Sequence, residues 1–483
     1  MKQPTPPRVP GASFFLNIGA MAGSRVLSVF AQVLVLPIIA RYLTIADFGA
    51  VALAMSIVVF AQLLSDCGLG RSLVRQSEVV PEEWDSVFWL LAGLGSLLSL
   101  SLFLTAPLWE ALFDFPGLSG LVQALSVIPL MQSLSAVSNA ALERDERFVW
   151  LGGLRTLAVI LSLAAAIGLA IAGAGAWCLI IQQIVLFATL ALGAAIASPY
   201  RPRLRLEPAW LTGHLRFARD TVGTSLVFTL QRQAPVMMLG YAVGAAPLGL
   251  FSMALRLLRL PELGLSGPAS QVVFVRMARQ ASDPAAIGAL YIAALRLLAL
   301  VILPGMFCLA GFAPDLIPLL LTDRWGDVAL VFALAAPAFA LEASTSMAGM
   351  AFYAAGQTTL RLRMATERAI LQIVCVAIAV PFGINVVAVV LSLFAVAYTP
   401  RLWWYTGRAT PFSQREALAA VVWPTIVGVL AWLVSALLIA PAVAQDAILL
   451  LFAAFGTAML TWGLAALPQL VALRRAVALL RTG

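Results

Sequence analysis

Runs of about 20 apolar residues recur along this chain from residue 13 to residue 468, and they constrain its fold more than any other feature. Each run is long enough to cross roughly 30 Å of hydrocarbon as a helix. Because unpaired backbone groups are costly in lipid, such repetition predicts an all-α polytopic membrane protein. The composition agrees, since 62% of the residues are hydrophobic and 11% are charged, whereas soluble domains are about 25% charged.

We predict fourteen spans, separated by loops that carry Gly, Pro and Asp. They are residues 13–40, 49–70, 86–108, 119–141, 149–172, 177–197, 220–242, 248–275, 288–312, 328–355, 364–382, 385–403, 420–440 and 447–468. The first is longer than the apolar core of a signal peptide, which has about 7–15 residues, and we therefore expect a retained helix.

The distribution of basic residues predicts the orientation. Outside the spans, only Arg41 and Arg324 fall on the side opposite the N-terminus, whereas the segment 198–219 alone holds five arginines. By the positive-inside rule, both termini are expected on the cytoplasmic side of the membrane. The net charge of +8 then reflects contact with anionic membrane lipid, and no nucleic-acid partner is expected.

A short internal similarity predicts two lobes. Residues 42–54 resemble residues 241–254, and Gly49 aligns with Gly249. Six spans per half give both halves the same orientation, which is typical of a parallel repeat with the substrate path between the lobes. The predicted parts are an N-lobe (1–197), a basic cytoplasmic linker (198–219), a C-lobe (220–403), and a C-terminal part (404–483) with spans 13 and 14 and a basic tail.

Seven arginines fall well inside the predicted spans. They are Arg25, Arg155, Arg232, Arg256, Arg259, Arg296 and Arg368. Arg401, in contrast, lies two residues from the end of its span and is counted with the basic loop that follows. A charge in hydrocarbon costs about 2.5–3.5 kcal/mol on insertion scales, so such residues usually face a cavity or a partner. The excess of positive charge predicts an anionic substrate that is handled within the membrane.

Arg25 and Arg232 each lie about twelve residues into a span, near the bilayer midplane. Guanidinium groups bind phosphate oxygens bidentately, so both are candidates for binding a diphosphate. The alternative is an arginine that only neutralises an internal carboxylate.

Other charged residues of the spans have weaker assignments. Arg256 and Arg259 share a helix face, and either phosphate binding or an Arg259–Glu262 ion pair beside a proline kink is expected. Arg256 is the better binding candidate of the two. Arg296 is a further phosphate-binding candidate. Arg155 and Arg368 lie near span ends, where snorkelling to the headgroups predicts a structural role.

Carboxylates are the candidates for ion coupling. Glu342 and Asp66 could each bind a proton or a cation, or only neutralise an arginine. Glu367 is expected to pair with Arg363, four residues earlier. The single histidine, His214, is expected in a polar loop. The four cysteines are expected to be small core residues, and neither a metal nor a cofactor is predicted.

Several motifs occur in an order that resembles the Wzx-type polysaccharide flippases of the multidrug/oligosaccharidyl-lipid/polysaccharide exporter superfamily. They are G-S-R-V-L-S at 23–28, A-R-Y-L-T-I-A-D-F-G at 40–49, A-Q-L-L-S-D-C-G-L-G at 61–70, L-V-R-Q at 73–76, E-R-D-E-R-F at 143–148, L-G-Y at 239–241 and D-R-W at 323–325. The resemblance implies two six-helix lobes, alternating access, and export of an oligosaccharide on a polyprenyl diphosphate. In the lipid II flippases of this superfamily the arginine of the S-R-V-L pattern lines the cavity, and that role carries over to Arg25.

The resemblance also implies the partners: a polyprenyl-diphosphate-linked oligosaccharide and membrane lipids, with a polysaccharide polymerase and chain-length machinery as candidates. Lipid II export remains an alternative, because the carrier is the same. A multidrug antiporter for organic cations is disfavoured by the positive excess. An enzyme such as a glycosyltransferase is also disfavoured, since the outer loops are short and no G-x-x-x-x-G-K-[ST] or H-E-x-x-H motif occurs.

Overall fold

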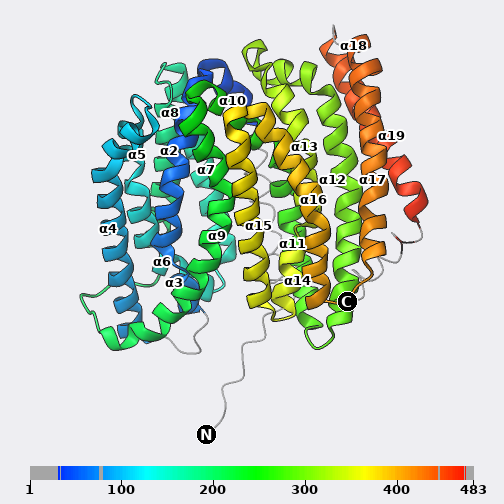
Figure 1. Cartoon of the computed structure of the whole chain (residues 1–483). Helices are drawn as coiled ribbons and strands as arrows, with labels where there is room; N and C mark the ends of the chain where they lie inside the picture. Colours follow the sequence, from blue (N-terminus) through cyan, green and yellow to red (C-terminus); the bar gives the residue numbers. More distant parts are fainter. Residues whose placement is uncertain are drawn as a thin grey trace. The chain divides into compact units, whose positions relative to one another are not determined.

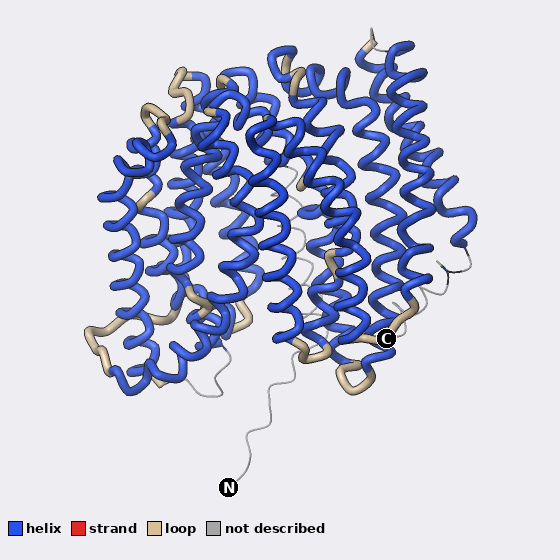
Figure 2. The backbone as a smooth tube through the Cα atoms, viewed as in Figure 1, coloured by secondary structure: helices blue, strands red, loops and turns tan. Residues whose placement is uncertain are grey.

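The computed structural model describes residues 31–32, 34–74, 80–443, 446–470, 472 and 474. Within these residues every regular element is a helix, as Figures 1 and 2 show. Eleven of the helices are long and apolar enough to cross a membrane. The all-α polytopic fold that the sequence predicts is therefore confirmed, although the number of fourteen spans is not, because most of predicted span 1 lies outside the described residues and spans 7 and 8 are not among the eleven.

The chain forms two compact units. The first consists of residues 1–43 and 54–226, and the second of residues 44–53 and 227–483. Unit 1 contains most of α2 (Ile45–Asp66), α3 (Leu69–Val74), α4 (Pro81–Phe113), α5 (Leu118–Leu125), α6 (Val127–Arg144), α7 (Phe148–Ile171), α8 (Trp177–Ala197), η1 (Pro208–Trp210) and the start of α9 (Leu211–Val243).

Unit 2 contains the first turns of α2, the rest of α9, and the helices that follow. These are α10 (Ala245–Leu258), η2 (Glu262–Ser266), α11 (Gly267–Arg279), α12 (Pro284–Leu321), η3 (Asp323–Trp325), α13 (Val328–Thr345), α14 (Ala348–Ala354), α15 (Thr358–Ala379), η4 (Val380–Phe382), α16 (Ile384–Ala409), α17 (Gln414–Val434), η5 (Ser435–Ile439), α18 (Ala440–Val443), α19 (Ala447–Ala466) and η6 (Leu467–Gln469).

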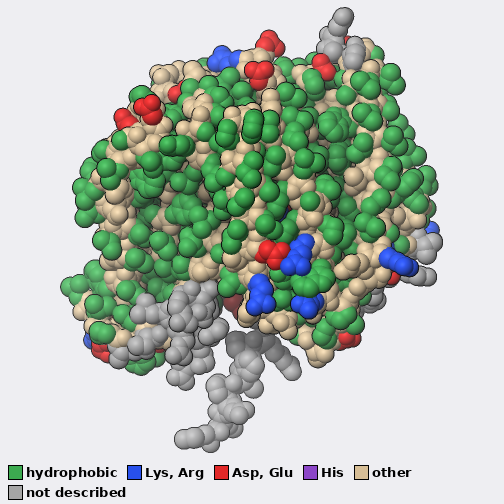
Figure 3. All heavy atoms as spheres, viewed as in Figure 1, with side chains coloured by type: hydrophobic (Ala, Val, Ile, Leu, Met, Phe, Trp, Pro, Cys, Tyr) green, Lys and Arg blue, Asp and Glu red, His purple; other side chains and the backbone are tan. Residues whose placement is uncertain are grey.

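Local sequence signals set the helix ends. The side chain of Asp283 accepts hydrogen bonds from the backbone N–H groups of Ala285 and Ala286 and so caps α12, where Pro284 occupies the first position. Asp446 caps α19 in the same way, through Ile448 and Leu449. Large hydrophobic side chains remain exposed along the spans, and they dominate the face seen in Figure 3. In a chain of this composition that exposure is the surface offered to lipid.

The predicted linker, residues 198–219, is folded against the start of α4 within unit 1. Asp85 accepts hydrogen bonds from the Tyr200 hydroxyl at 2.8 Å and from the Arg203 N–H at 3.1 Å. Burial, together with this carboxylate, raises the pKa of Tyr200. Arg205 pairs with Glu82 at 2.8 Å. A segment that composition alone predicts as a loop therefore carries specific contacts to unit 1.

His214 does not lie in a polar loop, and that expectation is wrong. It is buried in α9, where its Nε2 lies 2.6 Å from Glu83 Oε1 and its Nδ1 lies 2.6 Å from the Ser72 hydroxyl. The helix begins at Leu211, three residues earlier. The histidine thus joins α3, α4 and α9, which explains a polar residue in an otherwise apolar core.

Close helix contact in unit 2 requires two glycines. A Cβ at Gly49 of α2 would overlap the backbone carbonyl of Ala245, and a Cβ at Gly249 of α10 would overlap that of Ile45. The two contacts are reciprocal, and the four positions are related by the separation of 200 residues that the sequence similarity has. The backbones of α2 and α10 are therefore in close contact at this crossing.

Candidate functional site

A cluster of charged side chains, partly exposed, is formed by helices of unit 2. It contains Arg232 on α9, Arg259 just after α10, Glu262 on η2, Glu342 on α13 and Arg368 on α15. We call these five residues the charge cluster. Three guanidinium groups and two carboxylates leave one excess positive charge.

The break between α10 and α11 positions two members of the cluster. Predicted span 8 is not one continuous α-helix, because α10 ends at Leu258 and a π-helical turn follows from Glu262 to Ser266. Pro261 removes a backbone donor at this point, which accounts for the interruption. The turn directs Glu262 toward α9, where its carboxylate accepts two hydrogen bonds from Arg232 Nη2 at 2.6 and 2.8 Å.

The expected Arg259–Glu262 ion pair is therefore not the one that forms. Residues three apart share a face only in a regular α-helix, and the π-helical turn breaks that register. Arg232 takes the carboxylate instead, and its side chain remains 48% exposed.

Arg259 forms no short ion pair with any described residue. Its guanidinium interacts electrostatically with Arg232, Glu342 and Glu262. Its Nε is buried and has no hydrogen-bond partner among the described residues. Unpaired buried donors are rare in native proteins, and each calls for an explanation. Arg368 Nε is unpartnered in the same way, but Arg368 forms an ion pair with Glu342. Arg259 is therefore the guanidinium of the cluster that forms no short ion pair with a described residue.

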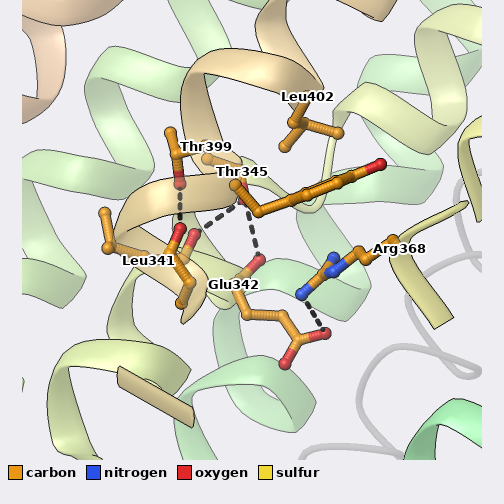
Figure 4. Close-up of a pocket in the computed structure, with 8 residues that line it drawn as sticks. Leu341, Glu342, Thr345, Arg368, Thr399 and Leu402 are labelled. Carbon is orange, nitrogen blue, oxygen red and sulfur yellow. Dashed lines mark hydrogen bonds and ion pairs between the residues drawn. The ribbon is translucent and has the colours of Figure 1, made fainter. Parts of the chain in front are cut away.

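The carboxylate of Glu342 pairs with Arg368, whose Nη2 lies 3.2 Å from Oε1 (Figure 4). Glu342 also interacts electrostatically with Arg232 and Arg259, so the two ion pairs belong to one network. The snorkelling predicted for Arg368 is wrong, because its side chain is only 19% exposed and is directed to Glu342.

A small hollow lies beside this pair. It is lined by Leu341, Glu342, Thr345, Arg368, Ala395, Tyr398, Thr399 and Leu402, as the close-up shows in part (Figure 4). Its volume of about 10 Å³ suffices for roughly one water molecule. The hydroxyls of Thr345 and Thr399 donate to backbone carbonyls of their own helices. This hollow is a polar pocket next to the cluster and is too small for a sugar.

The other candidates from the sequence lie apart from the cluster or outside the described residues. Arg25 and the side chain of Asp66 are outside them. Arg256 is half-buried on α10 and Arg296 is half-buried on α12, and no ion pair or hydrogen bond among the described residues joins either one to the cluster. The binding roles of these residues stay predictions.

Glu367 forms a second, more exposed charged group with α16. Its carboxylate accepts hydrogen bonds from Arg401 at 2.9 and 3.1 Å and from the Tyr405 hydroxyl at 2.5 Å. The expected pair with Arg363 is therefore replaced by a pair between helices. Planar Arg–carboxylate geometry is more favourable than contact between two flexible side chains on one helix.

The fold and the charge cluster define a class: polytopic helical membrane proteins with an excess of positive charge within their spans. The profile of the polysaccharide biosynthesis protein family matches residues 38–330, which is more than half of the chain. The chain belongs to this family, and the resemblance to the Wzx-type flippases is confirmed.

Relatives of known name agree with this membership. The chain is 25% identical over 323 residues to the succinoglycan biosynthesis transport protein ExoT of Rhizobium meliloti (strain 1021), and the match covers 66% of this chain and 65% of the relative. It is 23% identical over 303 residues to the lipopolysaccharide biosynthesis protein WzxC of Escherichia coli (strain K12), covering 62% and 61%. The chain thus spans less than two thirds of the length of these relatives.

Solved structures support the fold. The lipid II flippase MurJ, in an inward closed conformation, superposes with a TM-score of 0.71 at 13% identity, covering 94% of this chain and 99% of MurJ. A mutant of a MATE protein superposes with a TM-score of 0.51 at 16% identity, covering 81% of this chain and 95% of that one. At these identities the likeness concerns the fold alone.

Proposed function

We propose that this protein is a flippase that moves a polyprenyl-diphosphate-linked oligosaccharide from the cytoplasmic to the outer leaflet of a bacterial inner membrane. The oligosaccharide would be a repeat unit for surface polysaccharide biosynthesis. Membership of the polysaccharide biosynthesis family and relatives named for lipopolysaccharide and succinoglycan biosynthesis support this substrate class. Transport would proceed by alternating access through a cationic cavity.

The observation that carries the proposal is Arg259, whose buried Nε has no partner among the described residues and which belongs to a network with excess positive charge. A diphosphate offers several anionic oxygens, and arginine binds such oxygens through two parallel hydrogen bonds. Arg232 and Arg368 are held by carboxylates and would supply the surrounding positive field. Of the remaining candidates, Arg25 would add a further phosphate contact, as its S-R-V-L motif implies.

The charge balance of the cluster suits a site that must both bind and release an anion. With both carboxylates ionised the cluster attracts an anion through one net charge, which allows binding without making release slow. Glu342 is the proposed coupling residue, because a proton on its carboxylate would free Arg368 for the head group. Asp66 remains a second coupling candidate from the sequence.

A complementation assay tests the proposal. A bacterium that lacks its own repeat-unit flippase is given the wild-type gene or the Arg259→Gln variant, and surface polysaccharide is measured by immunoblot. We expect export with the wild type and at least about a tenfold loss with Arg259→Gln, since a charge-assisted hydrogen bond contributes about 1.5–3 kcal/mol.

Arg279→Gln serves as the control, because Arg279 is exposed at the end of α11. Membrane insertion of every variant is checked by quantitative blotting of membrane fractions. Full export by inserted Arg259→Gln would contradict the phosphate role. If the gene instead rescues a strain that lacks lipid II export and does not restore surface polysaccharide, the substrate is lipid II, which has the same carrier and a different sugar.

A further inference from the structure

Arg361, in the first turn of α15, is held by aromatic rings and has unused hydrogen-bond donors. Its Cζ lies 3.8 Å from the ring centroid of Tyr353 and 5.0 Å from that of Phe228. Its Nη2 lies 3.6 Å from the position that a Cβ on Gly349 would take. The two rings and the glycine fix the guanidinium by cation–π contact and close packing.

Two nitrogens of this guanidinium, Nε and Nη1, are buried and have no hydrogen-bond partner among the described residues. Together they carry three N–H groups. No ion pair to a described carboxylate neutralises the charge, in contrast to Arg232, Arg368 and Arg401. Aromatic stacking stabilises the positive charge but leaves these in-plane donors unsatisfied. The described residues around Arg361 therefore leave these donors available to an acceptor.

The position of Arg361 relates it to the charge cluster. Arg361 and Arg368 are seven residues apart, on one face of α15, and are separated by about 10 Å of helix rise. Phe228 and Arg232 are four residues apart, on one face of α9. The residue that stacks on Arg361 thus lies one turn before the residue that pairs with Glu262.

We propose that Arg361 is a second binding site for the diphosphate of the polyprenyl carrier, on the side from which the head group enters. This inference rests on the proposed function and on the predicted orientation, in which α15 begins at the cytoplasmic surface. The donors of Arg361 capture phosphate oxygens first, and the head group then passes to Arg259 in the cluster. Stacking keeps the guanidinium plane in place, so little side-chain entropy is lost on binding.

Binding of a short carrier to the purified protein tests this site. Geranylgeranyl diphosphate is titrated against the full chain in nanodiscs of neutral phosphatidylcholine, and Kd is measured for the wild type, Arg361→Gln, Arg361→Lys and Arg259→Gln. We expect Arg361→Gln to raise Kd about tenfold, because charge-assisted hydrogen bonds are lost. Arg361→Lys should raise Kd about threefold, since the charge stays but the planar fork is lost.

Arg363→Gln is the matched control, since Arg363 lies two residues away and is exposed. Its Kd should remain within about twofold of the wild type. Thermal unfolding is followed for each variant. If Arg361→Gln does not fold, the test rests on Arg361→Lys. An unchanged Kd of folded Arg361→Lys for geranylgeranyl diphosphate overturns the proposed site.

The outcomes separate this inference from the proposed function. A Kd raised by Arg259→Gln but unchanged by either Arg361 variant overturns the second site and leaves the proposed function standing. Unchanged Kd values in all variants overturn the proposed function as well. A phospholipid of the membrane is the other possible source of a phosphate group. If phosphatidylglycerol stabilises the wild type but not Arg361→Gln, and the Kd for geranylgeranyl diphosphate is the same in both, Arg361 binds membrane lipid. That result would overturn the proposal that Arg361 binds the carrier.

Discussion

Glu342 shows how a single carboxylate adjusts the charge cluster. It pairs with Arg368 and acts electrostatically on Arg232 and Arg259, so it opposes three guanidinium groups at once. Removing its charge raises the formal excess of the cluster from one positive charge to two. Such a change strengthens the attraction for an anion and also slows its departure.

We therefore predict opposite effects of Glu342→Gln on binding and on transport. The Kd for geranylgeranyl diphosphate should fall about fivefold, equivalent to roughly 1 kcal/mol, while export in the complementation assay should decrease. Glu367→Gln is the control, because Glu367 pairs with Arg401 outside the cluster. Weaker binding by Glu342→Gln would show that the cluster does not hold the anion.

Residue types and their depth in the spans could be predicted from the sequence, but their partners could not. Arg232, Arg259 and Glu342 are recognisable because they are charges within apolar runs. The Arg232–Glu262 pair depends on a π-helical turn after Pro261, which a regular helical period misses. The unused donors of Arg361 depend on rings from α9 and α14, which no local pattern brings together. His214 was missed for the same reason, since its partners come from distant helices.

At the scale of helices, the reciprocal glycine contacts allow the backbones of α2 and α10 to pack closely against each other within unit 2. The sequence signal for them was the aligned pair Gly49 and Gly249, and the structure shows that each supports the backbone of the other helix. Close backbone approach of this kind is a usual way for helices to associate in membranes, where hydrophobic burial gives little driving force.

We predict that Gly249→Ala destabilises the protein by about 1–3 kcal/mol, because a methyl group at this position overlaps a backbone carbonyl that cannot move aside. Gly456→Ala in α19 is the control, since nothing lies within 4 Å of its added Cβ. It should be neutral or slightly stabilising. Chemical unfolding in detergent, followed by tryptophan fluorescence, measures both. Equal stability of the two variants would contradict the close crossing.

The buried histidine makes a corresponding prediction for unit 1. His214→Ala removes hydrogen bonds to Glu83 and Ser72 that join α9 to α4 and α3. We expect a loss of about 2 kcal/mol, since buried polar groups lose their partner. Protease sensitivity of the segment 198–219 should rise, because α9 follows it directly. Unchanged unfolding and proteolysis would mean that the histidine contacts contribute no net stability.

At the scale of the whole molecule, most of the spans follow from apolar length alone, and eleven of them recur as long helices within the described part of the chain. Hydrophobic length does not fix where a span is interrupted, so the break in predicted span 8 appears only in the structure. That break places Arg259 and Glu262 in the charge cluster, on which the proposed function rests. Fold and family membership are the basis on which we propose transport of an anionic lipid-linked sugar, with Arg259 as the proposed phosphate-binding residue.

Flipping in proteoliposomes tests this account most directly. The purified protein is reconstituted with a fluorescent polyprenyl-diphosphate-linked oligosaccharide, and arrival of the sugar in the other leaflet is followed with a membrane-impermeant quencher. The account predicts flipping by the wild type, an at least about tenfold lower rate for Arg259→Gln, and a wild-type rate for Arg363→Gln. Equal flipping rates for wild type and Arg259→Gln, at equal reconstitution, would contradict it.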